Sequence, residues 1–183
     1  RCGATRLPSK VAEGEVPRVD QLRPITLLPT DYKLLTMILA QRLIEVLEEV
    51  ITSGQLCSIR NQNIHFGTHN LLSGLMYLEE RELAEVEEGC FASEIGGGVL
   101  LSYDLFKAYD RVYLPYLLKV MEAMGFGAKF ISWVKMLHED ASTRFILNKL
   151  TRPVSILISV RQGDPVAMIL FLSFVEPLLV KIK

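Results

Sequence analysis

The sequence predicts an α+β fold of mixed elements rather than a doubly wound sheet, and three observations support this prediction. Half of the 183 residues are hydrophobic, so a sizeable core is available. Several long segments carry apolar residues at three- and four-residue spacing, which is typical of amphipathic helices. Short runs of β-favouring residues lie among them in the order β, α, α, β, α, α, β, β, α, without the regular alternation of a doubly wound sheet.

The N-terminal third predicts a linker, a strand and a helix. Residues 1–21 contain scattered charges, prolines and glycines, which favour a loop. Residues 22–28 are a short β-rich run, and Thr30 or Asp31 is suited to cap a helix over residues 32–51. The apolar residues expected on the buried face of that helix are Leu35, Ile38, Leu39, Leu43, Leu47 and Val50.

The middle of the chain predicts a second helix and a strand. After a loop at residues 52–63, helical spacing links the apolar residues Leu71, Leu72, Leu75, Met76 and Leu78. A break is expected at Gly89. Three glycines at 96–98 predict a flexible lead-in rather than a phosphate cradle, because no GK[ST] follows. Residues 99–104 then form an apolar run of strand length that ends in an acid.

The C-terminal third predicts two helices, two strands and a last helix. Residues 114–124 and 128–139 are amphipathic, and Gly125 between them is suited to a glycine C-cap. The two strands are expected at 143–147 and 154–160, and the last helix has Pro165 near its first turn.

Charge and cysteine usage bear on the partners and the location of the protein. The formal net charge of −1 argues against a generic basic nucleic-acid coat, so any nucleic-acid site must come from local clustering. The acidic residues 79–88 predict a solvated helix end, with docking of a basic partner as the alternative. The cysteines are odd in number and lack CxxC spacing, which favours reduced thiols in an intracellular, cytoplasmic or nuclear protein. Residues 166–180 are too few and too interrupted for a membrane span, so we expect no membrane crossing.

Asp104 is the first candidate for chemistry. It closes the apolar run 99–104, where a buried carboxylate without a partner is costly. Such an Asp caps a turn, pairs with a base or binds a cation, and spacing alone leaves these alternatives open.

Five segments, in this order along the chain, together resemble the reverse transcriptases of non-LTR retrotransposons, and they cover nearly the whole chain from Gln21 onward. They are residues 22–28 with 31–33, Gln55, residues 102–112, residues 125–126 with 131–134, and residues 161–165. The resemblance implies the fingers and part of the palm of a right-hand polymerase: a linker at 1–21, a fingers-like region at 22–98 and a partial palm at 99–183.

The resemblance also implies roles for individual residues. Asp104 would be catalytic and would hold magnesium, with the carbonyl of Leu105 as a further candidate ligand. Tyr109 would lie against the incoming sugar and exclude a 2′-hydroxyl by bulk, and its alternative role is core packing.

Three further residues are expected near the nucleotide. Arg23 would bind the triphosphate, for which a guanidinium is well suited, or would simply be a surface residue. Gln162 and Gly163 would lie beside the nucleotide and template, or would form an ordinary turn before the last helix. Asp110 is expected to stabilise the start of a helix.

The implied reaction adds deoxynucleotides to a DNA primer on an RNA template with Mg²⁺; the oligomeric state is left open. The sequence has no Asp-Asp pair, with which such enzymes complete the metal site on a second hairpin, so we expect the chain to lack that hairpin and the thumb and to be inactive alone. Asp164 is expected to add negative charge near the nucleotide. The alternative is a non-catalytic, retrotransposon-derived module that binds nucleic acid or another protein.

Overall fold

The computed structural model describes residues 2–8, 15–60, 62–87 and 100–182, with the backbone alone at 82–87. The chain divides into two compact units. The first, here called the sheet unit, comprises Arg1–Thr52 and Lys107–Lys183, and the second, the helical unit, comprises Ser53–Phe106. The mixture of helices with a small mixed sheet confirms the predicted α+β class.

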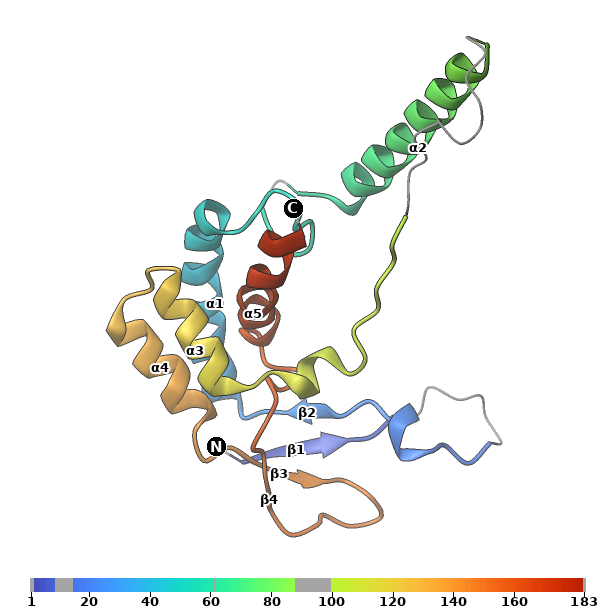
Figure 1. Ribbon diagram of the computed structural model, residues 1–183. Helices are drawn as coiled ribbons and strands as arrows, with labels where there is room; N and C mark the ends of the chain where they lie inside the picture. Colours follow the sequence, from blue (N-terminus) through green and yellow to red (C-terminus); the bar gives the residue numbers. More distant parts are fainter. Residues whose placement is uncertain (1, 9–14, 61, 88–99, 183) are drawn as a thin grey trace. The chain divides into compact units, whose positions relative to one another are not determined.

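In the sheet unit, the strands among the described residues form one sheet in the order β2-β1-β3-β4. Strand β1 (Cys2–Arg6) pairs antiparallel with β2 (Ile25–Leu27) and parallel with β3 (Ser142–Phe145). Strand β3 pairs antiparallel with the short β4 (Val154–Ser155). The first strand therefore lies inside the sheet, between segments from distant parts of the sequence (Figure 1).

Four helices lie to one side of this sheet in Figure 1. They are α1 (Thr30–Val50), α3 (Leu114–Ala123), α4 (Ala128–His138) and α5 (Ala167–Ile182). Helix α3 packs on α4 and α5, and α1 also contacts α5. The core that they share is aliphatic, as expected for ridges of leucine and valine that interdigitate. Its most buried members include Leu39, Leu43, Leu47, Leu117, Met121, Val134 and Leu170.

The turn between α3 and α4 confirms the predicted glycine C-cap. Gly125 has a φ of +85°, which glycine adopts without steric cost. Its N–H donates to Glu122 O at 3.0 Å, and the N–H of Phe126 donates to Met121 O at 3.0 Å. This pair of bonds is a Schellman motif that satisfies the last carbonyls of α3.

The described part of the helical unit is dominated by α2 (Ile64–Glu87). Its apolar residues Phe66, Leu72 and Met76 are exposed, and so are Glu79 and Glu80 at the start of the acidic stretch. The predicted break at Gly89 and the glycines at 96–98 lie outside the described residues. Within the described ranges, none of the helices combines the length and apolar character needed to cross a membrane.

Two predictions about strands need correction: a strand occurs where a linker was expected, and an expected strand does not form over its described part. The linker expected at 1–21 contains β1, whose residues Gly3 and Ala4 have low β propensity, so its strand state depends on pairing with β3 far along the chain. The strand expected at 99–104 is wrong over its described part, because residues 100–104 have no regular structure and Leu101 is 68% exposed. An apolar run becomes a strand only where another strand pairs with it.

The first helix has the predicted extent but a different cap and buried face. The N-cap residue is Pro29, without a side-chain hydrogen bond, and Thr30 and Asp31 lie in the first turn instead. Of the residues expected to be buried, Leu35 and Ile38 are exposed. The buried stripe is Thr36, Leu39, Ala40, Leu43 and Leu47.

Candidate functional site

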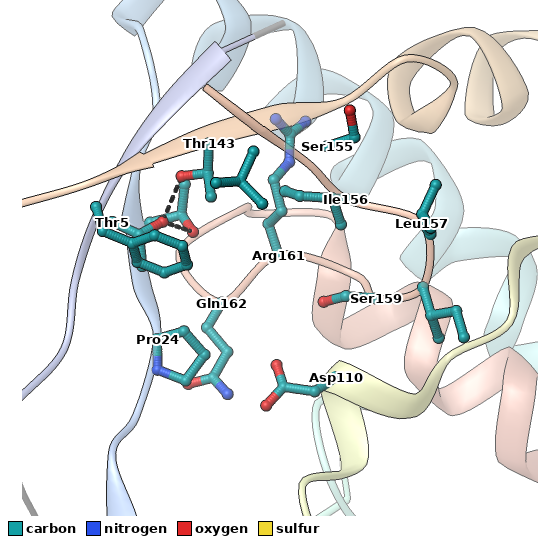
Figure 2. Close-up of a pocket in the computed structure, with 14 residues that line it drawn as sticks. Thr5, Pro24, Asp110, Thr143, Ser155, Ile156, Leu157, Ser159, Arg161 and Gln162 are labelled. Atoms are coloured by element: carbon teal, nitrogen blue, oxygen red, sulfur yellow. Dashed lines mark hydrogen bonds between the residues drawn. The ribbon is translucent and has the colours of Figure 1, made fainter. Parts of the chain in front are cut away.

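A cavity of about 270 Å³ opens in the sheet unit where several of the motif segments meet. Figure 2 shows the amide of Gln162 and the carboxylate of Asp110 on the same side of this cavity, with Pro24 beside them. Three motif segments therefore line the same cavity although they are far apart in sequence. They contribute Pro24, Asp110 and Gln162. The lining is completed by Thr5, Thr26, Thr143, Phe145 and residues 154–159 and 161.

One wall of the cavity is a row of threonine hydroxyls across three strands. Thr5 Oγ1 on β1 lies 2.9 Å from Thr26 Oγ1 on β2 and 2.6 Å from Thr143 Oγ1 on β3. All three residues are buried. Cross-strand threonine bonds of this kind hold the register of a sheet, so the wall has a fixed geometry. The sequence alone does not predict this row, because β1 has a weak composition for a strand.

The loop that carries Gln162 is held against β2. The N–H of Thr26 donates to Gln162 O at 2.8 Å. Gly163 has a φ of +103°, and a Cβ at this position would lie 2.5 Å from Thr26 O. Because Gly163 has no side chain, the loop can lie close against the backbone of β2. A role of Gly163 beside a nucleotide stays a prediction.

Tyr109 and Asp110 lie in a short 3-10 helix, η2 (Ala108–Arg111), and of these two residues Asp110 lines the cavity. The Tyr109 ring stacks on Phe171 of α5 with centroids 5.1 Å apart, and its hydroxyl lies 3.3 Å from Met168 Sδ. Packing on α5 is therefore one role of Tyr109, and its expected role at the sugar is untested.

Asp110 lies in the first turn of η2, in keeping with its expected place at a helix start, and it also lines the cavity, which the sequence alone does not predict. Burial raises the pKa of Asp110, and the nearby Lys107 ammonium opposes that shift. The carboxylate is thus partly desolvated by the walls of the cavity, where it faces any occupant.

Arg23 is exposed at the edge of the same region. Its N–H donates to Pro8 O at 3.1 Å, which fixes the backbone just before Pro24. The exposed side chain fits either the surface role or the triphosphate role that the sequence left open.

Asp104 and Leu105 belong to the helical unit, and both are exposed. The expectation that Asp104 ends a buried strand is wrong, because residues 100–103 before it are neither in a strand nor buried. Its assignment as a magnesium ligand, which came from the family resemblance, stays a prediction. No group of three or more His, Cys, Asp and Glu side chains that could hold a metal ion occurs in the part of the chain that the structure describes.

A buried polar network lies beneath the Gln162 loop. The hydroxyl of Tyr32 on α1 donates to Asp164 Oδ2 at 3.0 Å and accepts a hydrogen bond from Arg161 Nη2. The guanidinium of Arg161 also lies over the Tyr32 ring, 4.6 Å from its centroid, and 4.0 Å from Asp164 Oδ2. Asp164 is only 6% exposed. Its charge is therefore balanced by Arg161 beneath the loop, and Asp164 is not among the residues that line the cavity. The expectation that Asp164 adds negative charge near a nucleotide stays a prediction.

Three of the motif segments therefore contribute to one cavity in the sheet unit. Residues 12–183 match the family model described as reverse transcriptase (RNA-dependent DNA polymerase), and the chain belongs to this family. It is also 31% identical over 174 residues to the "Transposon TX1 uncharacterized 149 kDa protein" of Xenopus laevis. That match covers 94% of this chain but 12% of the relative's length. The predicted recognition as a reverse transcriptase domain of a non-LTR retrotransposon is confirmed by these matches.

Proposed function

We propose that the chain provides the fingers and part of the palm of an RNA-directed DNA polymerase, whose complete form adds deoxynucleotides to a primer 3′-hydroxyl on an RNA template. The observation that supports this proposal most directly is the meeting of three motif segments at one cavity in a chain that matches the reverse transcriptase family from residue 12 to residue 183. These segments contribute Pro24, Asp110 and Gln162 to its lining.

In this proposal the cavity receives part of a deoxynucleoside triphosphate. The Gln162 amide offers both a donor and acceptors to the nucleotide. The exposed Arg23 guanidinium is free to turn toward the triphosphate, to which its fork of donors is matched. Tyr109, anchored by its stacking on Phe171, would limit space at the 2′ position of the sugar.

Magnesium would be held by Asp104 and the carbonyl of Leu105. The fit is partial: an exposed carboxylate is a suitable hard ligand, but one carboxylate does not complete the ligand set of two ions. Bound magnesium would activate the attacking hydroxyl and neutralise the leaving pyrophosphate. We therefore propose that the chain by itself binds nucleotide without extending a primer. We also propose that the complete protein works in the cytoplasm or nucleus.

A second candidate is a non-catalytic module derived from a retrotransposon, which binds nucleic acid or another protein. The acidic stretch that begins with the exposed Glu79 and Glu80 on α2, and that could dock a basic partner, favours it. It differs from the first proposal in having no need for a nucleotide at the cavity.

The test combines nucleotide binding with primer extension. Wild-type chain, Gln162→Ala and Arg23→Ala are titrated with a fluorescent deoxynucleoside triphosphate in the presence of magnesium and an RNA template with a DNA primer. Each substitution is expected to weaken binding about tenfold, which is the effect of losing a hydrogen bond to a charged or polar ligand group. The control Lys149→Ala changes an exposed residue that does not line the cavity and should bind as the wild type does.

Primer extension is measured in the same mixtures with wild type and Asp104→Ala. Extension by the wild type that is lost in Asp104→Ala would refute the proposed inactivity of the isolated chain. Template binding without any nucleotide binding by a folded chain would instead support the non-catalytic module.

A further inference from the structure

The network beneath the cavity suggests a role for residues that have no assigned place in the reaction. Along the loop, both Gln162 and Arg161 line the cavity, but Arg161 is only 2% exposed, and Asp164, which does not line the cavity, is 6% exposed. Figure 2 shows the guanidinium of Arg161 pointing away from the Gln162 amide and the Asp110 carboxylate. The loop therefore has one side facing the cavity and one side anchored in the core.

Tyr32 is the centre of the anchored side. Its hydroxyl accepts from Arg161 Nη2 and donates to Asp164 Oδ2, so one oxygen joins both ends of the loop to helix α1. Burial raises the pKa of Tyr32, with a further contribution from the negative charge of Asp164. The hydroxyl thus stays protonated and able to donate.

Asp164 links the same network to the start of α5. Its second oxygen, Oδ1, accepts the N–H of Val166 at 3.2 Å, and its carbonyl accepts the N–H of Ala167 at 3.1 Å. A carboxylate in this place caps the helix that follows. Its two oxygens therefore fix the C-terminal end of the loop from two directions.

On the opposite side, β2 holds the backbone of the loop through the bond from Thr26 N–H to Gln162 O. Between these two attachments the backbone of Gln162 has little freedom to move. We propose that Tyr32 and Asp164 are positioning residues, which orient Gln162 toward the nucleotide by anchoring its loop on α1 and α5. This inference rests on the proposed nucleotide site.

The test uses the full chain and compares Tyr32→Phe with the matched control Thr36→Val. Tyr32→Phe removes the hydroxyl but keeps the ring beneath the Arg161 guanidinium. Thr36 is a buried residue one turn further along α1, and its hydroxyl bonds Lys33 O within the helix at 3.2 Å. Thr36→Val therefore removes a buried hydroxyl from the same helix without touching the network.

Two readouts are measured: hydrogen exchange of the Thr26 amide, and affinity for a fluorescent deoxynucleoside triphosphate with magnesium, primer and template. Tyr32→Phe is expected to speed Thr26 exchange and to weaken nucleotide binding, each about tenfold, because an anchored hydrogen bond is lost. Thr36→Val should leave both within about twofold of the wild type. Asp164→Asn, which can still cap α5, should weaken binding similarly, and the double variant should lose less than the product of the two single effects.

The outcomes separate this inference from the proposed function. Equal effects of Tyr32→Phe and Thr36→Val on both readouts, or no effect of Tyr32→Phe on Thr26 exchange, would overturn the positioning role. A third outcome is that the wild-type chain binds no nucleotide, while Tyr32→Phe but not Thr36→Val speeds hydrogen exchange of the Thr26 amide. In that case Tyr32 does anchor the loop, and the proposed nucleotide site is wrong. Multiplicative effects of Tyr32→Phe and Asp164→Asn would show that the two residues act separately, contrary to the proposal.

Discussion

Replacing Gly163 with alanine is expected to destabilise the sheet unit by about 3 kcal/mol. At the observed φ of +103°, a residue with a Cβ costs about 1–3 kcal/mol. The new Cβ would also lie 2.5 Å from Thr26 O, so the loop must move away from β2. That movement breaks the 2.8 Å bond from Thr26 N–H to Gln162 O, which adds about 1 kcal/mol.

Alanine substitutions at two other glycines separate the cost of the backbone conformation from the cost of the contact with Thr26. Gly125 has a φ of +85° with nothing within 4 Å of its ideal Cβ, so Gly125→Ala should cost about 1–2 kcal/mol from the backbone alone. Gly127 has a φ of −63° and open space, so Gly127→Ala should change the stability by less than about 0.5 kcal/mol.

Urea denaturation of the three variants can be followed by the fluorescence of Trp133, the single tryptophan, which lies on α4 in the sheet unit. The free energies of unfolding should fall in the order Gly127→Ala, Gly125→Ala, Gly163→Ala. If Gly163→Ala is no less stable than Gly125→Ala, then the contact with Thr26 is not a steric constraint and the close apposition of the loop and β2 is refuted.

Three further predictions concern ionisable groups that are buried or partly buried. Burial lowers the pKa of His138 below its usual 6.5. As the pH falls below 6.5, His138 is therefore protonated more readily in the unfolded chain than in the native state. The wild type should therefore lose stability in urea titrations as pH falls through and below that value, and His138→Met should flatten the dependence. Burial raises the pKa of Asp110 above 3.8, so its contribution to stability is lost as pH rises through the raised pKa, and Asp110→Asn should gain in thermal stability relative to wild type between about pH 3 and about pH 7. Glu176 Oε1 accepts the N–H of Thr52 at 2.8 Å, so Glu176→Ala should lower the unfolding free energy by about 2 kcal/mol and Glu176→Gln by less, and equal losses would argue against this bond.

The local elements were predicted well because their signals lie within a few residues. Apolar spacing gave the extent of α1, α3 and α4 to within about two residues, and Gly125 gave the turn between the last two. The buried face of α1 was predicted less well. Several residues satisfy the same spacing, and only the tertiary packing around α1 decides that Thr36 and Ala40 are covered while Leu35 and Ile38 are exposed.

The strands show where local patterns fail. β1 has a weak composition for a strand, yet it pairs on both sides, whereas the apolar residues 100–104 have a strand-like composition and no strand structure. A strand is stabilised by its partner's backbone, so its formation depends on chain segments that no local window contains.

The sequence by itself determined the family, the order of the motifs and the candidate residues, because these are properties of residue identity and spacing. Only the tertiary structure decided that Asp110 shares a cavity with Gln162, and that Asp164 is buried against Tyr32. Tyr32 and Asp164 are 132 residues apart in sequence. Their hydrogen bond exists because the packing of α1 beneath the loop brings a hydroxyl to a buried carboxylate, whose burial is costly unless its oxygens have partners.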